Sequence, residues 1–214
     1  MSEMRTEEEQ IEAMKKWWEE NGKQTLVAVV LVAGGWLGFN NYQDTQRETA
    51  EAASVVYQEM LTLSASEAEA DKGQRAVLLD KLQSEFSSTV YSQFAALFKA
   101  KDAVEAGDLE LAETELTSVV SSAKDEALQH TATVRLARVM VAAGKLDDAL
   151  ALLANDNVGA FEAEYQETSG DALLAKGDKD AARDAYSKAV IAAQRIGANN
   201  PVLQMKLDDL AVAN

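Results

Sequence analysis

Residues able to perform catalytic chemistry are scarce in this sequence of 214 residues. His130 is its single histidine, it has no cysteine, and the phosphate-binding pattern GxxxxGK followed by Ser or Thr does not occur. These counts exclude thiolate nucleophiles, disulfides and zinc–cysteine sites, and they leave no histidine pair to bind a metal. Gln129, Thr131 and Thr133 surround His130, so we interpret it as a packing or surface residue.

Carboxylates are the one abundant reactive group, because 36 acidic residues oppose 20 basic ones for a net charge of −16. Acidic runs at 7–9 and 67–71 are typical of solvated helix faces, and the stretch 155–157 lacks the ligand spacing of a calcium loop. A carboxylate pair of the glycosidase type stays open, but a helical repeat offers it no obvious cleft. We therefore predict a non-enzymatic protein with no catalytic residue, metal or cofactor, and its acidity disfavours nucleic-acid binding.

The elements that position these residues are predicted to be helices throughout. The chain has 38 alanines and one proline, a composition that favours helix. Three glycines recur 37 and 33 residues apart, close to the 34-residue period of tetratricopeptide units. The glycines are Gly107, Gly144 and Gly177, and the alanine five positions after each is Ala112, Ala149 or Ala182. The spacing predicts a tetratricopeptide-like array of helical hairpins.

Helix-hairpin geometry explains the register of this repeat. We expect each glycine to end a first helix in the left-handed conformation, with Asp108, Asp147 and Asp178 at the start of the second helix. A small residue lies seven positions before each glycine and a large one nine positions after it, as close helix packing requires. These residues are Ala100, Ala137 and Gly170, and Leu116, Leu153 and Tyr186. Phe94, Leu97, Phe98 and Lys101 also follow helical spacing.

Further helices are expected on both sides of the array. Helices over Glu48–Ala70 and Gln74–Phe86 would cap its start, and a helix over Pro201–Leu210 would cap its end. Extra residues around 155–159 are interpreted as a turn in the middle unit.

An uncharged stretch near the N-terminus predicts a membrane anchor. Residues 24–43 carry no charge, and 18 to 20 helical residues span roughly 27–30 Å, about the hydrocarbon thickness of a bilayer. Interfacial aromatic residues flank it: Trp17, Trp18, Trp36 and Tyr42. A buried helix of a soluble protein is the alternative. Gly34 and Gly38 form a GxxxG motif, a candidate packing face for another membrane helix.

The distribution of basic residues predicts the orientation of this anchor. Arg5, Lys15, Lys16 and Lys23 precede the span, whereas Arg47 alone follows it closely, so we expect the N-terminus in the cytoplasm. The predicted domains are a cytoplasmic segment with a short amphipathic helix (1–24), an uncleaved transmembrane signal anchor (25–42) and an outer tetratricopeptide-like domain (43–214).

The whole chain resembles the YfgM family of bacterial inner-membrane proteins. The matching stretches are QIEAMKKWWEENGK (10–23), GGWLG (34–38), ASVVYQ (53–58), VRLARV (134–139), LAKGDK (174–179) and MKLDDL (205–210). This resemblance implies an ancillary subunit of the SecYEG translocon whose outer domain is periplasmic. It also implies partners among periplasmic chaperones, PpiD included, and unfolded exported polypeptides, with a role in regulating the Rcs envelope-stress response.

Two functions stay open for such a chain. One is the translocon-associated adaptor, and the other is a membrane-tethered scaffold for another envelope assembly, such as cell division or outer-membrane biogenesis. Residues 43–214 carry a net charge of −13, because four basic and seven acidic residues precede them. If part of this acidity lines a concave face, the face would prefer basic partners; if it is a solvated surface, it serves solubility.

Overall fold

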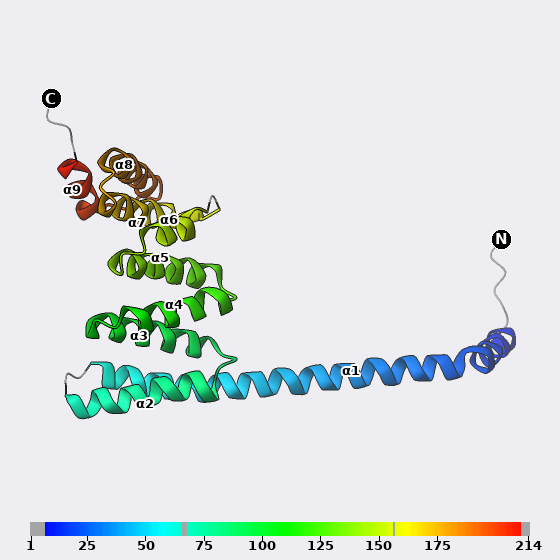
Figure 1. Ribbon diagram of the computed structural model, residues 1–214. Helices are drawn as coiled ribbons and strands as arrows, with labels where there is room; N and C mark the ends of the chain where they lie inside the picture. The colour runs from blue at the N-terminus through cyan, green and yellow to red at the C-terminus, as the bar shows by residue number, and fades with distance from the viewer. Residues whose placement is uncertain (1–6, 66–67, 156, 211–214) are drawn as a thin grey trace, which may run out of the picture. The chain divides into compact units, whose positions relative to one another are not determined.

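Every regular element in the described part of the chain is a helix. The computed structural model describes residues 7–65, 68–155 and 157–210 (Figure 1). The elements in these ranges are α1 (Glu7–Ser64), α2 (Glu69–Glu85), α3 (Val90–Ala106), α4 (Leu109–Ser122), α5 (Glu126–Ala142), α6 (Leu146–Leu153), the 3₁₀ helix η1 (Gly159–Phe161), α7 (Glu162–Ala175), α8 (Lys179–Arg195) and α9 (Pro201–Asp209). The all-α prediction is confirmed.

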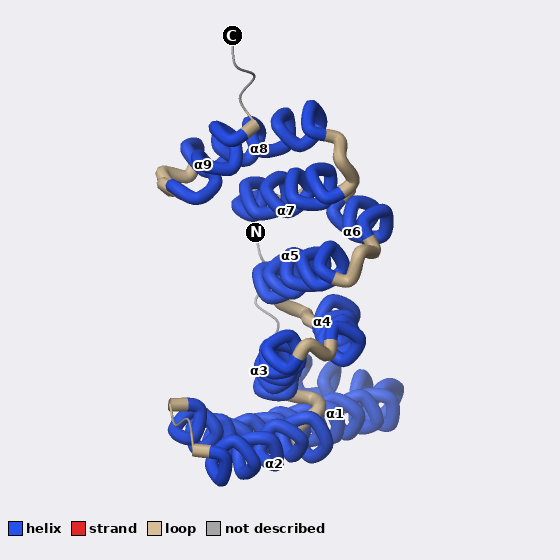
Figure 2. The backbone as a smooth tube through the Cα atoms, turned by 60° about the vertical axis from the view of Figure 1, so that its left-hand side comes forward, coloured by secondary structure: helices blue, strands red, loops and turns tan. Residues whose placement is uncertain are grey.

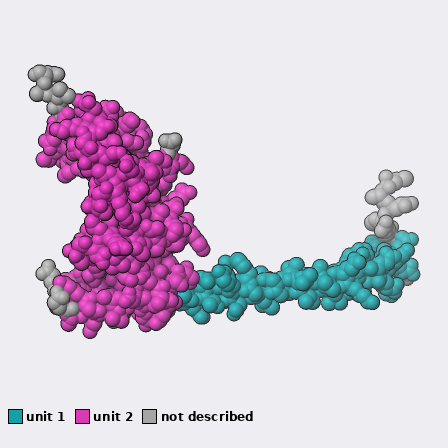
Figure 3. Space-filling model, viewed as in Figure 1, with its two compact units in different colours: residues 1–51 teal, residues 52–214 magenta. Residues whose placement is uncertain are grey.

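The chain divides into two compact units, residues 1–51 and 52–214 (Figure 3). Described residues of the first unit belong to α1, which holds one stretch long and apolar enough to cross a membrane, with 6% of that stretch buried. Large apolar side chains between Leu26 and Phe39 are 55–73% exposed. A core helix of a soluble protein would instead be mostly buried, so this exposure favours the membrane interpretation over that alternative.

Three helical hairpins stack in chain order within the second unit. The pairs are α3 with α4, α5 with α6, and α7 with α8, and α3, α5 and α7 lie in one layer while α4 and α6 lie in another (Figure 2). The part of α1 after residue 52 and α2 pack on α3 through a core that includes Met60, Leu79 and Leu82. At the other end α9 packs on α8 through Leu203.

The glycine register of the repeat is confirmed at all three hairpin turns. Gly107, Gly144 and Gly177 have φ values of 80°, 77° and 88°, the left-handed conformation that a side chain disfavours. After each glycine, the next backbone N–H donates to the carbonyl five residues earlier. These bonds are Asp108 to Ala103 (2.8 Å), Lys145 to Met140 (2.9 Å) and Asp178 to Leu173 (3.0 Å).

The expected acidic residues lie at the starts of the second helices. Asp108 accepts a hydrogen bond from the Leu111 N–H at 3.0 Å, and Asp178 accepts one from the Ala181 N–H at 3.1 Å. Asp147 lies in the first turn of α6, whose N-cap position is Lys145. Carboxylates at these positions are stabilised by the partial positive charge of the helix start.

The alanines of the repeat are fully buried where the helices of each hairpin meet. Ala112, Ala149 and Ala182 are each 0% exposed. The large residues Leu116, Leu153 and Tyr186 are buried as well, at 2%, 5% and 1% exposure. In the third hairpin Gly170 replaces the alanine of the other two because a Cβ there would lie 2.4 Å from the Tyr186 ring. The small and large positions therefore compensate each other.

Two of the predicted helices have the wrong bounds. The expected helix Glu48–Ala70 is part of α1, which begins at Glu7 and ends at Ser64, and the expected helix Gln74–Phe86 begins earlier, at Glu69, and ends at Glu85. No proline or glycine interrupts the chain between Gly38 and Ser64, so the apolar stretch and the following segment form one helix. The terminal helix, predicted over Pro201–Leu210, begins at Pro201 and ends at Asp209.

A partly buried polar cluster links the last helices. Lys206 of α9 reaches Glu167 at 2.8 Å and Asp171 at 2.8 Å, both on α7. The Tyr186 hydroxyl of α8 donates to the same Asp171 at 2.7 Å. Burial lowers the pKa of Lys206, but its hydrogen bonds to Asp171 and Glu167 outweigh burial and raise that pKa above its usual value. The cluster therefore links α7, α8 and α9 through charge-assisted bonds.

Candidate functional site

A groove runs between the first helices of the first two hairpins. One cavity of about 420 Å³ is lined by α3, α4 and α5, and an adjoining cavity of about 290 Å³ is lined by Tyr57 of α1 together with α3 and α5. Leu97, Lys101 and Arg135 line both cavities. The two cavities therefore form one surface, named the α3–α5 groove below.

Helical spacing brings two facing stripes of side chains to this groove. Residues at positions i, i+3, i+4 and i+7 share one face of a helix. On α3 these are Phe94, Leu97, Phe98 and Lys101, and on α5 they are Arg135, Arg138, Val139 and Ala142. The α3 stripe is the one predicted from the sequence, and it faces α5 across the groove.

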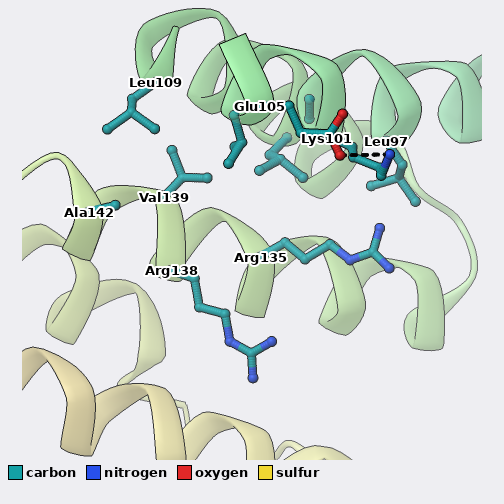
Figure 4. A pocket seen from close by; sticks show the side chains of 11 residues that line it. Leu97, Lys101, Glu105, Leu109, Arg135, Arg138, Val139 and Ala142 are labelled. Atoms are coloured by element: carbon teal, nitrogen blue, oxygen red, sulfur yellow. Dashed lines mark ion pairs between the residues drawn. The ribbon is translucent and has the colours of Figure 1, made fainter. Parts of the chain in front are cut away.

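The two ends of the groove are apolar. At one end Leu109, Val139 and Ala142 lie together (Figure 4), and the buried Leu116 lines the same cavity. At the other end the Tyr57 ring lies 5.7 Å from the Phe94 ring and 6.3 Å from the Phe98 ring, measured between centroids. Burial of a ligand's apolar side chains against such surfaces lowers the free energy of the complex.

Cationic side chains occupy the middle of the groove. Arg135 extends from α5 on the side that faces Lys101 of α3, whereas the Arg138 side chain turns away from α3, toward Thr168 of α7 (Figure 4). Lys101 pairs with Glu105 at 2.9 Å, and its hydrogen bond and charge lower the pKa of Glu105. Within the described residues Arg135 has no ion pair or side-chain hydrogen bond, and Arg138 uses only its Nε, which donates to Thr168 at 3.3 Å. Between α3 and α5 the lining therefore has one guanidinium group available for an anion, that of Arg135.

The hypothesis of an acidic concave face is wrong for this groove. Its lining contains Lys101, Arg135 and Arg138 against the single acidic residue Glu105. The acidic side chains lie elsewhere, on solvated surfaces and in ion pairs between helices. The sequence contained a signal for this site, because Arg135 and Arg138 stand one helical turn apart in a strongly acidic chain.

Ion pairs behind the groove hold its walls in place. Lys99 of α3 reaches Asp80 of α2 at 3.0 Å and Glu115 of α4 at 3.1 Å. Burial lowers the pKa of Lys99, but its hydrogen bonds to Asp80 and Glu115 outweigh burial and raise it. Arg75 of α2 also pairs with Asp102 of α3 at 2.7 Å. These contacts fix α2, α3 and α4 relative to one another.

The glycines and alanines that define the repeat, His130 and the GxxxG glycines lie outside the groove. The six glycines and alanines of the repeat are structural, since they form turns and helix contacts. His130 packs against Phe161 with ring centroids 5.2 Å apart, and its Nδ1 lies 2.9 Å from the Tyr165 hydroxyl, so the packing interpretation is confirmed. At Gly34 and Gly38 an added Cβ would meet no described atom within 4 Å. Both lie on the exposed apolar part of α1.

The fold and its groove define a class: helical-hairpin repeat proteins of the tetratricopeptide kind, here with a candidate membrane helix. The family model described as "Tetratricopeptide repeat-like domain" matches residues 15–212. Curated relatives named "Ancillary SecYEG translocon subunit" are 32% identical in Haemophilus influenzae and 33% identical in Escherichia coli, over 95% and 96% of this chain and 97% of theirs. The chain belongs to this tetratricopeptide repeat-like family of ancillary translocon subunits, and the resemblance seen in the sequence is confirmed. No solved structure matches the chain.

Proposed function

We propose that this chain is a non-enzymatic ancillary subunit of the SecYEG translocon. The observation that carries the proposal is the identity of 32–33% to translocon subunits along nearly the whole of both chains. Such coverage includes the membrane stretch and the repeat domain together, so the relationship extends beyond a shared repeat. The groove supports the proposal, because tetratricopeptide-like arrays present concave surfaces that bind polypeptides.

The proposed topology places the repeat domain in the periplasm. Four basic residues precede the apolar stretch of α1 and only Arg47 follows it closely, a bias that favours a cytoplasmic N-terminus. Residues 1–24 are then cytoplasmic, 25–42 span the inner membrane and 43–214 face the periplasm. Gly34 and Gly38 form the proposed packing face for a translocon helix, because their exposed backbone allows close approach.

In this arrangement the repeat domain helps transfer exported polypeptides to the periplasmic chaperone network. The proposed partners are SecYEG, PpiD and other periplasmic chaperones, and unfolded clients emerging from the translocon. Tethering beside the exit raises the effective concentration of the groove near each emerging segment, so weak binding is sufficient. Regulation of the Rcs envelope-stress response belongs to the same proposal, as a consequence of altered client handling.

Co-purification from membranes tests this proposal. The tagged full chain is solubilised in mild detergent, and SecY and PpiD are measured in the eluate. A variant carrying Gly34→Ile and Gly38→Ile should recover less SecY, because branched side chains block close helix packing, while the matched variant Ala28→Ile and Val32→Ile should not. Absence of SecY from the wild-type eluate, with division or outer-membrane assembly proteins in its place, would favour the scaffold function instead.

A further inference from the structure

We propose that the α3–α5 groove binds a polypeptide segment in which carboxylate side chains lie between bulky apolar side chains. This inference rests on the proposed function, since it names the chemistry of the segment that the repeat domain would hold. Three features of the groove carry it: its charge, the order of its subsites and its size.

The charge of the groove is opposite to that of the chain. The chain carries −16, but the groove lining has three basic side chains and one acidic one. Lys101 and Glu105 neutralise each other at 2.9 Å, which leaves the guanidinium group of Arg135 between the two helices, while Arg138 extends toward Thr168 of α7. Guanidinium groups bind carboxylates through paired, charge-assisted hydrogen bonds. The complement of this surface is therefore an acidic ligand.

The order of subsites along the groove favours a polypeptide over an anionic lipid. The aromatic end formed by Phe94 and Phe98 adjoins Arg135, and beyond the arginines lies the apolar end formed by Leu109 and Val139. A ligand must present an apolar, then an acidic, then an apolar group. A polypeptide can place side chains in that order, whereas a phospholipid has its anionic group at one end.

The dimensions of the groove agree with a few inserted side chains. Its larger cavity, about 420 Å³, falls within the range of roughly 300–1,000 Å³ typical of ligand pockets. Val104 is 45% exposed at the groove, so it is available for contact with a ligand. The groove can thus hold apolar side chains at both ends and carboxylates between them.

Fluorescence anisotropy with the full chain in detergent micelles tests the proposal. The probes are short labelled peptides with leucine and phenylalanine around a central pair of glutamates, glutamines or lysines. The wild-type chain should bind the glutamate peptide about tenfold more tightly than the glutamine peptide, and Arg135→Gln with Arg138→Gln should remove that difference. The control variant is Lys179→Gln with Lys188→Gln, at exposed positions of α8. It changes the net charge by the same amount as the arginine pair, and it should leave the preference for the glutamate peptide over the glutamine peptide unchanged.

A charge-reversal variant tests the proposal even if the Arg→Gln pair impairs folding. Arg135→Glu with Arg138→Glu should reverse the preference, so that the lysine peptide binds better than the glutamate peptide. Equal binding of the glutamate and glutamine peptides by the wild type would overturn the proposal. Loss of binding to phosphatidylglycerol vesicles in the Arg→Gln pair, with peptide binding unchanged, would assign the groove to lipid and also overturn it. Peptide discrimination without SecY in the co-purification would support the groove while refuting the translocon role.

Discussion

Replacing Gly170 with alanine tests the packing of the third hairpin. The new Cβ would lie 2.4 Å from Cε1 and 2.5 Å from Cδ1 of Tyr186, distances that real Cβ contacts essentially never show. The ring cannot yield freely, because Tyr186 is 1% exposed and its hydroxyl donates to Asp171 at 2.7 Å. Overpacking of a core costs about 1–3 kcal/mol, and the better helix propensity of alanine offsets up to about 1 kcal/mol of that.

We therefore expect Gly170→Ala to lower the free energy of unfolding by about 1–2 kcal/mol, or the Tm by roughly 2–8 °C. Urea and thermal unfolding of the fragment 44–214, followed by circular dichroism, measure this change. Gly73→Ala is the matched control, since a Cβ on that glycine of α2 meets no described atom within 4 Å, and it should be neutral or stabilising.

A compensating variant sharpens this test. Tyr186→Leu combined with Gly170→Ala recreates the alanine–leucine pairs of the other two hairpins, so it should recover part of the lost stability. If Gly170→Ala unfolds at or above the wild-type temperature, the small and large positions of the repeat do not compensate each other.

Four further predictions concern the stability of the repeat domain and the topology of the chain. Gly144→Leu places a branched side chain at φ 77°, so it should destabilise the domain by about 1–2 kcal/mol, and an unchanged Tm would contradict the role of this glycine. The fragment 44–214 should be soluble and helical by circular dichroism, and chelators should leave its unfolding curve unchanged. The pKa of Lys206 is raised in the folded state, so this residue contributes stability that is complete below about pH 10.5 and is lost as the pH rises through the raised pKa. The free energy of unfolding should therefore fall above about pH 10.5, and it should fall less in Lys206→Met. Tyr186, whose pKa is raised by burial and by Asp171, acts in the same direction, so the fall should not vanish in that variant. Protease added to spheroplasts should digest the repeat domain while a tag at residue 1 stays protected, and the reverse pattern would invert the proposed topology.

The turns of the repeat were predictable from sequence because their cause is local. A left-handed residue at a helix end requires glycine, and an acidic residue after it satisfies the next helix start, so Gly107 with Asp108 and Gly177 with Asp178 mark their hairpins. Gly197 has the same conformation at the end of α8, with φ 71°, but it is not one of the three glycines of the predicted register.

The groove was only half predictable because its second wall depends on tertiary packing. The α3 stripe from Phe94 to Lys101 could be seen in the helical spacing. Which face of α5 meets α3 depends on how α5 packs against α4 and α7, and local sequence does not determine that. The sequence analysis therefore assigned no site role to Arg135 or Arg138, and the structure shows that both line the groove. The extent of α1 was missed for a different, local reason: no proline or glycine stops the helix between Gly38 and Ser64.

Site-specific photo-crosslinking in intact membranes tests most directly whether this domain serves the translocon through its groove. A benzophenone amino acid is placed at Val104 in the groove or at Lys188 on α8, and the crosslinked partners are identified during active export. We predict that Val104 crosslinks to SecYEG-associated chaperones or to exported chains, that the crosslinks weaken in Arg135→Gln with Arg138→Gln, and that Lys188 gives few of them. Equal crosslinking from Val104 and Lys188, or crosslinks from Val104 only to proteins unrelated to export, would contradict this function for the groove.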